Sequence, residues 1–182
     1  SDIDFLQQLC HDAGLSLKCT DGKIVIFDQQ EYEGKDAVWT TVLDDKSYIK
    51  YGHSLGRAGT QYASCRVSYV GPDGKAIEGI AYVKDYDAKS KTNQQLEVMA
   101  AVTSKAEAKE LAAKKLRLYN KFERQMSFTF PGDPGKVAGL TFNAEGFGPW
   151  SGKYIVKQSK HTVSGSGGYT TQVIGRHTLG GY

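Results

Sequence analysis

Residue types that could support hydrolysis are sparse in this sequence. Cys10 and His11 form the one adjacent Cys–His pair, the combination that a thiol nucleophile and its base require. Neighbouring side chains on a helix point about 100° apart, so this pair does not predict a catalytic dyad. The other histidines are far apart and lack the short spacings of a zinc site: His53, His161 and His177. We expect a packed thiol, surface or structural histidines, and no metal ion or cofactor.

Two pairs of carboxylates and one glycine motif are candidates for acid–base catalysis and for dinucleotide binding, respectively. Asp44 and Asp45 are consecutive and project differently, while Asp85 and Asp87 lie at the polar end of a predicted strand. Solvation at turns and edges explains both pairs better than acid–base catalysis. The segment Gly146-Phe147-Gly148 resembles the start of a dinucleotide-binding fingerprint, but a strand follows it where that motif needs a helix, and we reject this interpretation.

One basic segment could contact phosphate groups. Between Ser104 and Arg124 there are seven Lys or Arg residues against three Glu residues. The aromatic residues Tyr119 and Phe122 belong to the apolar stripe of the predicted helix and offer no stacking platform among the charges. A solvated helix face is the better interpretation, and the sequence predicts no enzymatic activity and no small-molecule substrate.

The composition fits a soluble globular chain of one domain, or of one domain with a small appendage. The chain has 182 residues, of which 40% are hydrophobic and 24% charged, with a formal net charge of +3. No stretch approaches the roughly 20 apolar residues of a membrane span, so we expect no stable membrane association. Three cysteines are too few for a disulfide framework and favour free thiols, with one bridge as the alternative.

Hydrophobic periodicity and turn residues predict a β-rich chain with two helices. The predicted helices span residues 2–13 and 104–122, the second starting with a capping box of Ser104 and Glu107. A hairpin is predicted over 15–19 and 24–27, a polar connector without clear periodicity over 29–36, and a second hairpin over 66–70 and 77–85. Further strands are predicted at 38–43, 95–102, 126–130, 140–142, 154–161 and 169–174. Strand edges in such a chain must be closed, covered or paired with another chain, which favours assembly.

Two segments resemble a known family. Residues 1–9, SDIDFLQQL, followed by Gly14-Leu15, resemble the S-D-x-D-F-L-x-x-L…G motif of the phage late control gene D family of tail or baseplate hub proteins, and the corresponding segment of type VI secretion spike proteins. Residues 140–176 are similar to that family's C-terminal pattern, in which a G-x-Y/W strand leads to a histidine and a glycine-rich hairpin. The matching residues are Gly146-Phe147-Gly148, Gly152-Lys153-Tyr154-Ile155-Val156, His161 and Gly167-Gly168-Tyr169-Thr170-Thr171.

The resemblance implies an α+β, mostly β fold. Residues 38–182 would form a tail-tube-like β-barrel with the helix at about 104–122 lying across it, preceded over residues 1–37 by a helix and hairpin that belong to an α/β segment. Family members have an additional N-terminal barrel, so we expect this chain to be a C-terminal part with Ser1 at its boundary.

The resemblance also implies an architectural role. The protein would be a hub at the tip of a contractile phage or prophage-derived tail, a homotrimer that adapts the hexameric tail tube to a trimeric spike. It would assemble in the bacterial cytoplasm and reside in the virion tail or baseplate, with DNA only as passing cargo. The alternatives are a type VI secretion-like spike hub, or a tail-associated cell-wall-binding or hydrolase module.

The motif residues are expected to act as structural determinants. They are Asp4, Phe5, Leu6, Leu9, Gly14, Gly146, Gly148, Gly152, Tyr154, His161, Gly168 and Tyr169. Glycine permits positive φ or close backbone approach, so a substitution such as Gly152→Val is expected to destabilise folding without touching any chemistry.

Overall fold

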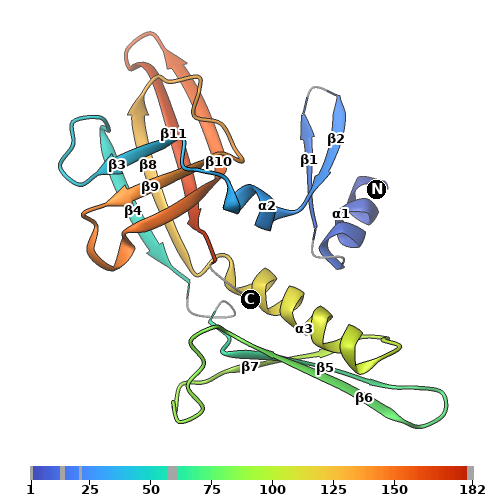
Figure 1. The fold of residues 1–182 in the computed structure, drawn as a ribbon. Helices are drawn as coiled ribbons and strands as arrows, with labels where there is room; N and C mark the ends of the chain where they lie inside the picture. The colour runs from blue at the N-terminus through green and yellow to red at the C-terminus, as the bar shows by residue number, and fades with distance from the viewer. Residues whose placement is uncertain (1, 13–14, 21, 57–60, 180–182) are drawn as a thin grey trace. The chain divides into compact units, whose positions relative to one another are not determined.

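The computed structural model describes residues 2–12, 15–20, 22–56 and 61–179 (Figure 1). The chain divides into two compact units, which are described separately. Unit 1 consists of Ser1–Asp28, Arg57–Asn120 and Leu179–Tyr182, and unit 2 consists of Gln29–Gly56 and Lys121–Thr178. This division differs from the predicted one: the boundary between residues 37 and 38 falls inside unit 2, and residues 57–120 belong to unit 1.

The N-terminal part of unit 1 is the predicted helix and hairpin. Helix α1 (Asp2–Asp12) has Asp2 and Asp4 in its first turn, where negative charge complements the helix dipole. Strands β1 (Ser16–Thr20) and β2 (Lys23–Phe27) pair antiparallel, and Gly22 adopts a φ of +70° in the turn between them. Asp21, the other residue of the predicted turn, lies outside the described residues.

The rest of unit 1 is a three-stranded sheet under one helix. The strands are β5 (Ser64–Val70), β6 (Ala76–Tyr82) and β7 (Gln95–Met99), in the order β6-β5-β7, and α3 (Lys105–Asn120) packs on β5 and β6. The predicted turn at 71–74 connects β5 and β6, with Gly74 at φ +77°. The shared core contains Cys65, Val67, Ala81, Val102, Ala108, Ala112 and Leu116. The predicted barrel over residues 38–182 included this segment, whereas the structure gives it a separate sheet, on which α3 packs.

The N-terminus of α3 carries one of the two hydrogen bonds of the predicted capping box. In the other, Thr103 takes the place of Ser104. The Glu107 backbone N–H donates to Ser104 Oγ at 3.2 Å. The Glu107 carboxylate, however, accepts from the backbone N–H and the hydroxyl of Thr103, at 2.7 and 2.6 Å. These bonds from Thr103 hold the pKa of Glu107 below its usual value, so the carboxylate stays ionised while it caps the helix.

Replacing Ser104 with alanine should lower the free energy of unfolding by about 1 kcal/mol, because it removes the acceptor for the Glu107 N–H at the start of α3. Denaturant titration of the two proteins measures the difference. Ser90→Ala in an exposed turn is a control that lies outside the helices and strands. An equal loss in the control, or none at Ser104, would contradict the capping role.

Unit 2 is a six-stranded sheet curled into half a barrel (Figure 1). Its strand order is β3-β9-β10-β11-β8-β4. The bounds are β3 (Trp39–Val42), β4 (Lys50–Leu55), β8 (Arg124–Pro131), β9 (Thr141–Glu145), β10 (Gly152–Ser164) and β11 (Gly168–His177), with a short 3₁₀ helix at Gly148–Trp150. Strands β3 and β9 are parallel and the other pairs antiparallel. This architecture confirms the predicted fold class.

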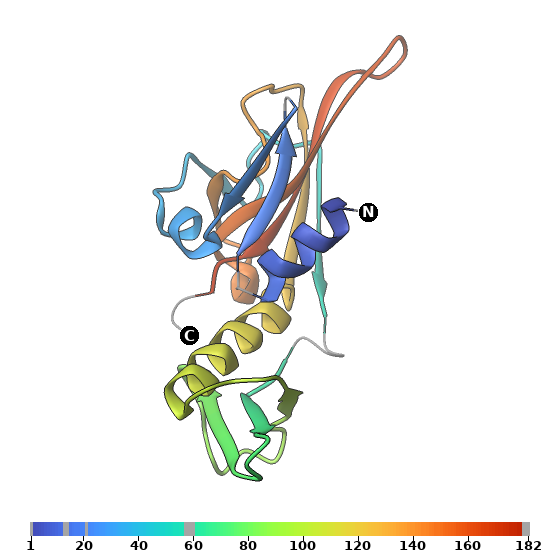
Figure 2. The ribbon, with the colours of Figure 1, turned by 90° about the vertical axis from the view of Figure 1, so that its right-hand side faces the viewer.

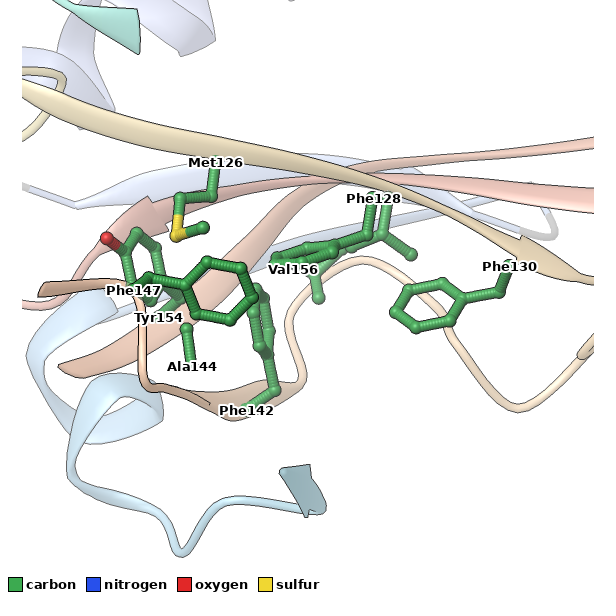
Figure 3. Close-up of a cluster of buried hydrophobic side chains, with 9 residues drawn as sticks. Met126, Phe128, Phe130, Phe142, Ala144, Phe147, Tyr154 and Val156 are labelled. Carbon is green, nitrogen blue, oxygen red and sulfur yellow. The ribbon is translucent and has the colours of Figure 1, made fainter. Parts of the chain in front are cut away.

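The core of unit 2 lies on the concave side of the curled sheet. Met126, Phe128 and Phe130 alternate along β8 and are buried, as their spacing predicts for one face of a strand. Figure 3 shows these side chains together with Phe142, Ala144, Phe147, Tyr154 and Val156 as one cluster. Trp39 stacks on Phe142 with ring centroids 5.0 Å apart. The other face of these strands carries Lys50 and Ser54 of β4 and Gln125, Ser127 and Thr129 of β8.

Two elements of unit 2 differ from the expectation. The connector at 29–36 contains a short helix, α2 (Gln29–Gly34), and Glu33 on it is buried. Strand β4 was not expected, because its sequence KYGHSL lacks apolar alternation. Both elements depend on partners that are distant in sequence: Arg176 for α2 and the whole of β8 for β4.

Candidate functional site

The residues of the first family motif lie on α1. Phe5 and Leu9 are 65% and 49% exposed, Leu6 is half-buried and Asp4 is exposed, whereas Cys10 is buried. Gly14 lies outside the described residues. Within the described part of the chain, the apolar residues of α1 are therefore only partly covered.

Four glycines of the second motif have positive φ angles in unit 2, which other residues rarely adopt. Gly146, Gly148 and Gly168 have φ values of +82°, +59° and +67°. Gly152 has a φ of +144°, and a Cβ atom there would lie 2.6 Å from Nε2 of His177. This gives the expected effect of Gly152→Val a physical reason, since the new side chain would meet both an unfavourable φ and an occupied space.

Tyr154 anchors the loop that follows β9. Its ring is fully buried and its hydroxyl donates to the carbonyl of Trp150 at 2.6 Å. Burial raises the pKa of this phenol to about 12, so it remains a proton donor. The ring also meets His177 edge-on, with centroids 5.1 Å apart. Tyr154 thus joins the 3₁₀ helix to the end of β11.

The half-buried His177 should make stability depend on pH. Burial lowers the pKa of its imidazole below 6.5, so on acidification the unfolded chain takes up a proton before the folded protein does. The contribution is complete above the ordinary pKa and is lost as the pH falls through the lowered folded value. We expect His177→Gln to flatten the loss of unfolding free energy as the pH falls below about 6.5, measured by denaturant titration at several pH values. An unchanged slope would contradict this.

His161 and Tyr169, predicted from the family motif, are in direct contact. Nδ1 of His161 lies 2.9 Å from the Tyr169 hydroxyl, and its Nε2 lies 3.1 Å from Oγ of Ser159. Ser159 donates its hydroxyl proton to the carbonyl of Lys136, so its oxygen accepts from Nε2–H. This pattern directs the Ser159 proton away from the imidazole, which does not suit a nucleophile and its base.

The same network fastens the loop after β8 to the β10–β11 hairpin. The N–H of Gly132 donates to the carbonyl of Tyr169 at 2.8 Å, and the N–H of Asp133 donates to Oγ1 of Thr171 at 2.9 Å. A Cβ atom on Gly132 would lie 1.9 Å from the Tyr169 ring. A hydrogen bond from Lys136 holds the pKa of Asp133 below its usual value. The arrangement holds the outer half of the hairpin against this loop.

A buried ion pair, which the sequence did not predict, holds α2 on the sheet. Nη2 of Arg176 lies 2.5 Å from Oε1 of Glu33 and 2.9 Å from Oε1 of Gln29. Glu33 and Arg176 are 7% and 3% exposed. The two residues are separated by most of the chain, so no local pattern could have paired them.

An open pocket of about 130 Å³ lies where the concave side of unit 2 meets its edge. It is lined by Leu43, Tyr51, His53, Met126, Gly146, Phe147 and Trp150. His53 packs on Trp150 with ring centroids 4.7 Å apart, and Tyr51 meets Phe147 edge-on at 5.2 Å. The lining is mostly aromatic and apolar, which suits an apolar group from a partner.

Cys65 is a buried thiol, whereas the two carboxylate pairs lie on the surface. Burial raises the pKa of the Cys65 thiol to about 11, which keeps it protonated. Asp44, Asp45, Asp85 and Asp87 are exposed at turns. Within the described residues, no group of three or more His, Cys, Asp or Glu side chains is placed to hold a metal ion. None of the helices in that part of the chain is both long and apolar enough to cross a membrane.

The fold is shared with solved tail proteins of phages and prophages. The match to a tail protein from Neisseria meningitidis MC58 covers 96% of this chain and 54% of that one, with 12% identity and a TM-score of 0.73. The 43 kDa tail protein of prophage MuSo2 from Shewanella oneidensis matches over 97% and 54%, with 14% identity and a TM-score of 0.69. Prophage tail protein gp18 from Listeria monocytogenes EGD-e matches over 98% and 53%, with 10% identity and a TM-score of 0.57.

At these low sequence identities, the TM-scores show a shared fold. The chain spans about half the length of the tail proteins that it matches. The sequence matches no protein-family model and no curated protein.

Proposed function

We propose that this chain is an architectural subunit of a phage or prophage-derived tail, at the hub that joins the tail tube to the spike. The fold that it shares with tail proteins supports this role, as does the resemblance of its two motifs to the late control gene D family. The protein would act by geometry, as a homotrimer whose three-fold ring matches a hexameric tube to a trimeric spike. It would perform no catalysis and take no small-molecule substrate.

The observation that carries the proposal is the open half-barrel of unit 2. Its edge strands β3 and β4 are not paired with each other, and among the described residues each has one strand neighbour. Strand edges of this kind bind another strand or require cover, and a ring of curled sheets satisfies them. Closed cyclic symmetry limits such pairing to a defined number of copies.

The proposed partners are further copies of the chain, the tail tube and the spike, with DNA passing through the ring as cargo. The protein would be assembled in the bacterial cytoplasm and would remain in the tail or baseplate of the particle, without stable membrane association. These assignments follow from the proposed hub role and are tested by the same experiment.

Native mass spectrometry of the natural full-length protein tests the assembly. The expected result is a species of three times the polypeptide mass that persists on dilution. A monomer at every concentration would contradict the ring. Clearing of a peptidoglycan suspension by the purified protein would instead favour a cell-wall hydrolase.

A further inference from the structure

The pocket of unit 2 lies beside an unpaired strand edge. Tyr51 and His53, which line the pocket, are both on β4, and in the described chain β4 pairs only with β8. An open edge offers backbone hydrogen bonds to an added strand, and a neighbouring pocket accepts one of that strand's alternate side chains. At about 130 Å³ the pocket has room for a single aliphatic or small aromatic group.

Unit 2 also has an extended arm, the end of the β10–β11 hairpin at residues 157–171. Figure 2 shows this hairpin, in orange and red, projecting beyond the rest of the sheet. Strand β10 pairs with β9 only over Gly152–Ile155, so within the described residues its last five residues, 160–164, pair only with β11. Val163, at 80% exposed, is an apolar side chain on this free strand.

The arm and the pocket rim have complementary charges. No Asp or Glu occurs from residue 146 to the end of the sequence, and Lys157 and Lys160 on the arm are exposed. Asp44, Asp45 and Glu145 are exposed next to the pocket residues Leu43 and Gly146. Lys46 and, at the start of β4, Lys50 are opposing charges. The bond from Leu43 N–H to the carbonyl of Glu145, at 2.9 Å, brings the two acidic segments together.

We propose that the arm of a second copy of this chain adds to the free edge of β4 and inserts Val163 into the pocket. The inference rests on the proposed self-assembly and assigns its two contact surfaces. The last five residues of β10 are enough to pair with most of the six residues of β4. Because donor and acceptor are different surfaces, the contact is heterologous, and repeating it generates a ring if the rotation closes.

Photo-crosslinking between isotopically distinct copies tests this contact. Tyr51 is replaced by benzoylphenylalanine in unlabelled protein, which is mixed with ¹⁵N-labelled protein, irradiated and digested with trypsin. We expect a mixed-isotope product that joins residue 51 to the tryptic peptide 161–176, which contains Val163. The matched control carries the photoreactive residue at Ser54, whose side chain points to the other face of β4. Products joining residue 51 to another peptide, or only within one copy, would overturn the proposal.

A second pair of variants tests the anchor residue without altering the pocket. Val163→Asp should weaken self-association at least about tenfold in sedimentation equilibrium, whereas Thr162→Asp, on the other face of the same strand, should change it less than about twofold. Equal effects of the two variants would overturn the insertion of Val163. A trimer that forms without the crosslink would overturn this inference alone and leave the proposed hub intact. A protein that never associates would overturn both.

Discussion

Replacing Arg176 with alanine should lower the free energy of unfolding by about 3–5 kcal/mol. The guanidinium is buried and contacts Glu33 at 2.5 Å and Gln29 at 2.9 Å. Its removal takes the charge of Arg176 away from the buried Glu33 carboxylate, and losing such a partner costs far more for a buried carboxylate than for an exposed one. Equilibrium denaturant unfolding, followed by the fluorescence of Trp39 and Trp150 in unit 2, measures the loss.

A surface pair and a double variant are the controls for this prediction. Glu110→Ala breaks the exposed contact between Glu110 and Lys114 on α3, and it should cost about 0.5 kcal/mol or less. Replacing both buried partners, as in Glu33→Leu with Arg176→Met, should cost less than Arg176→Ala alone, because neither charge is left buried. Additive losses in the double variant would contradict a coupled buried pair.

Replacing Gly79 with alanine should also destabilise the protein, by about 3 kcal/mol. A Cβ atom at this position of β6 would lie 2.3 Å from the backbone nitrogen of Lys109 and 2.5 Å from the carbonyl carbon of Ala108. These are backbone atoms of α3, so the whole helix must move away from the sheet. Ala108 and Ala112, the fully buried residues of α3 in this core, would lose part of their packing.

Hydrogen exchange of residues 64–120 reports this second change directly. In Gly79→Ala, amides of α3 and β6 should lose protection, because the helix no longer packs closely on the sheet. Gly165→Ala is the matched control, since a Cβ atom there meets nothing within 4 Å and its φ is not positive. That variant should be neutral or slightly stabilising. A Gly79→Ala protein as stable as the parent would show that α3 does not pack so closely on β6.

The parts of the fold that follow from local chemistry could be predicted from the sequence. The turn of Gly71-Pro72-Asp73-Gly74 specifies the β5–β6 hairpin by itself, and the alternation of Met126, Phe128 and Phe130 defines a buried strand face. The parts that were missed depend on distant partners. Strand β4 is a strand because β8 pairs with it, and α2 is held in place by Arg176.

Only part of the candidate site could be predicted, because the rest of it depends on partners that are distant in sequence. The family resemblance singled out His161 and Tyr169, which the structure places in contact. Thr171, which also belongs to the family motif, joins this network. Ser159 and Asp133 come from two other segments and were not singled out. The pocket likewise combines side chains from a turn, a strand edge and a 3₁₀ helix, so only the folded chain brings them together.

The central claim is that this chain is a structural part of the tail at the junction of tube and spike. Immunogold electron microscopy tests it most directly, on particles purified from the cells that carry the gene and labelled with an antibody against residues 1–182. We predict gold at the tail tip alone, with the intact polypeptide present in the particles. Gold along the whole tube or on the head, or particles that lack the polypeptide, would contradict the proposed role.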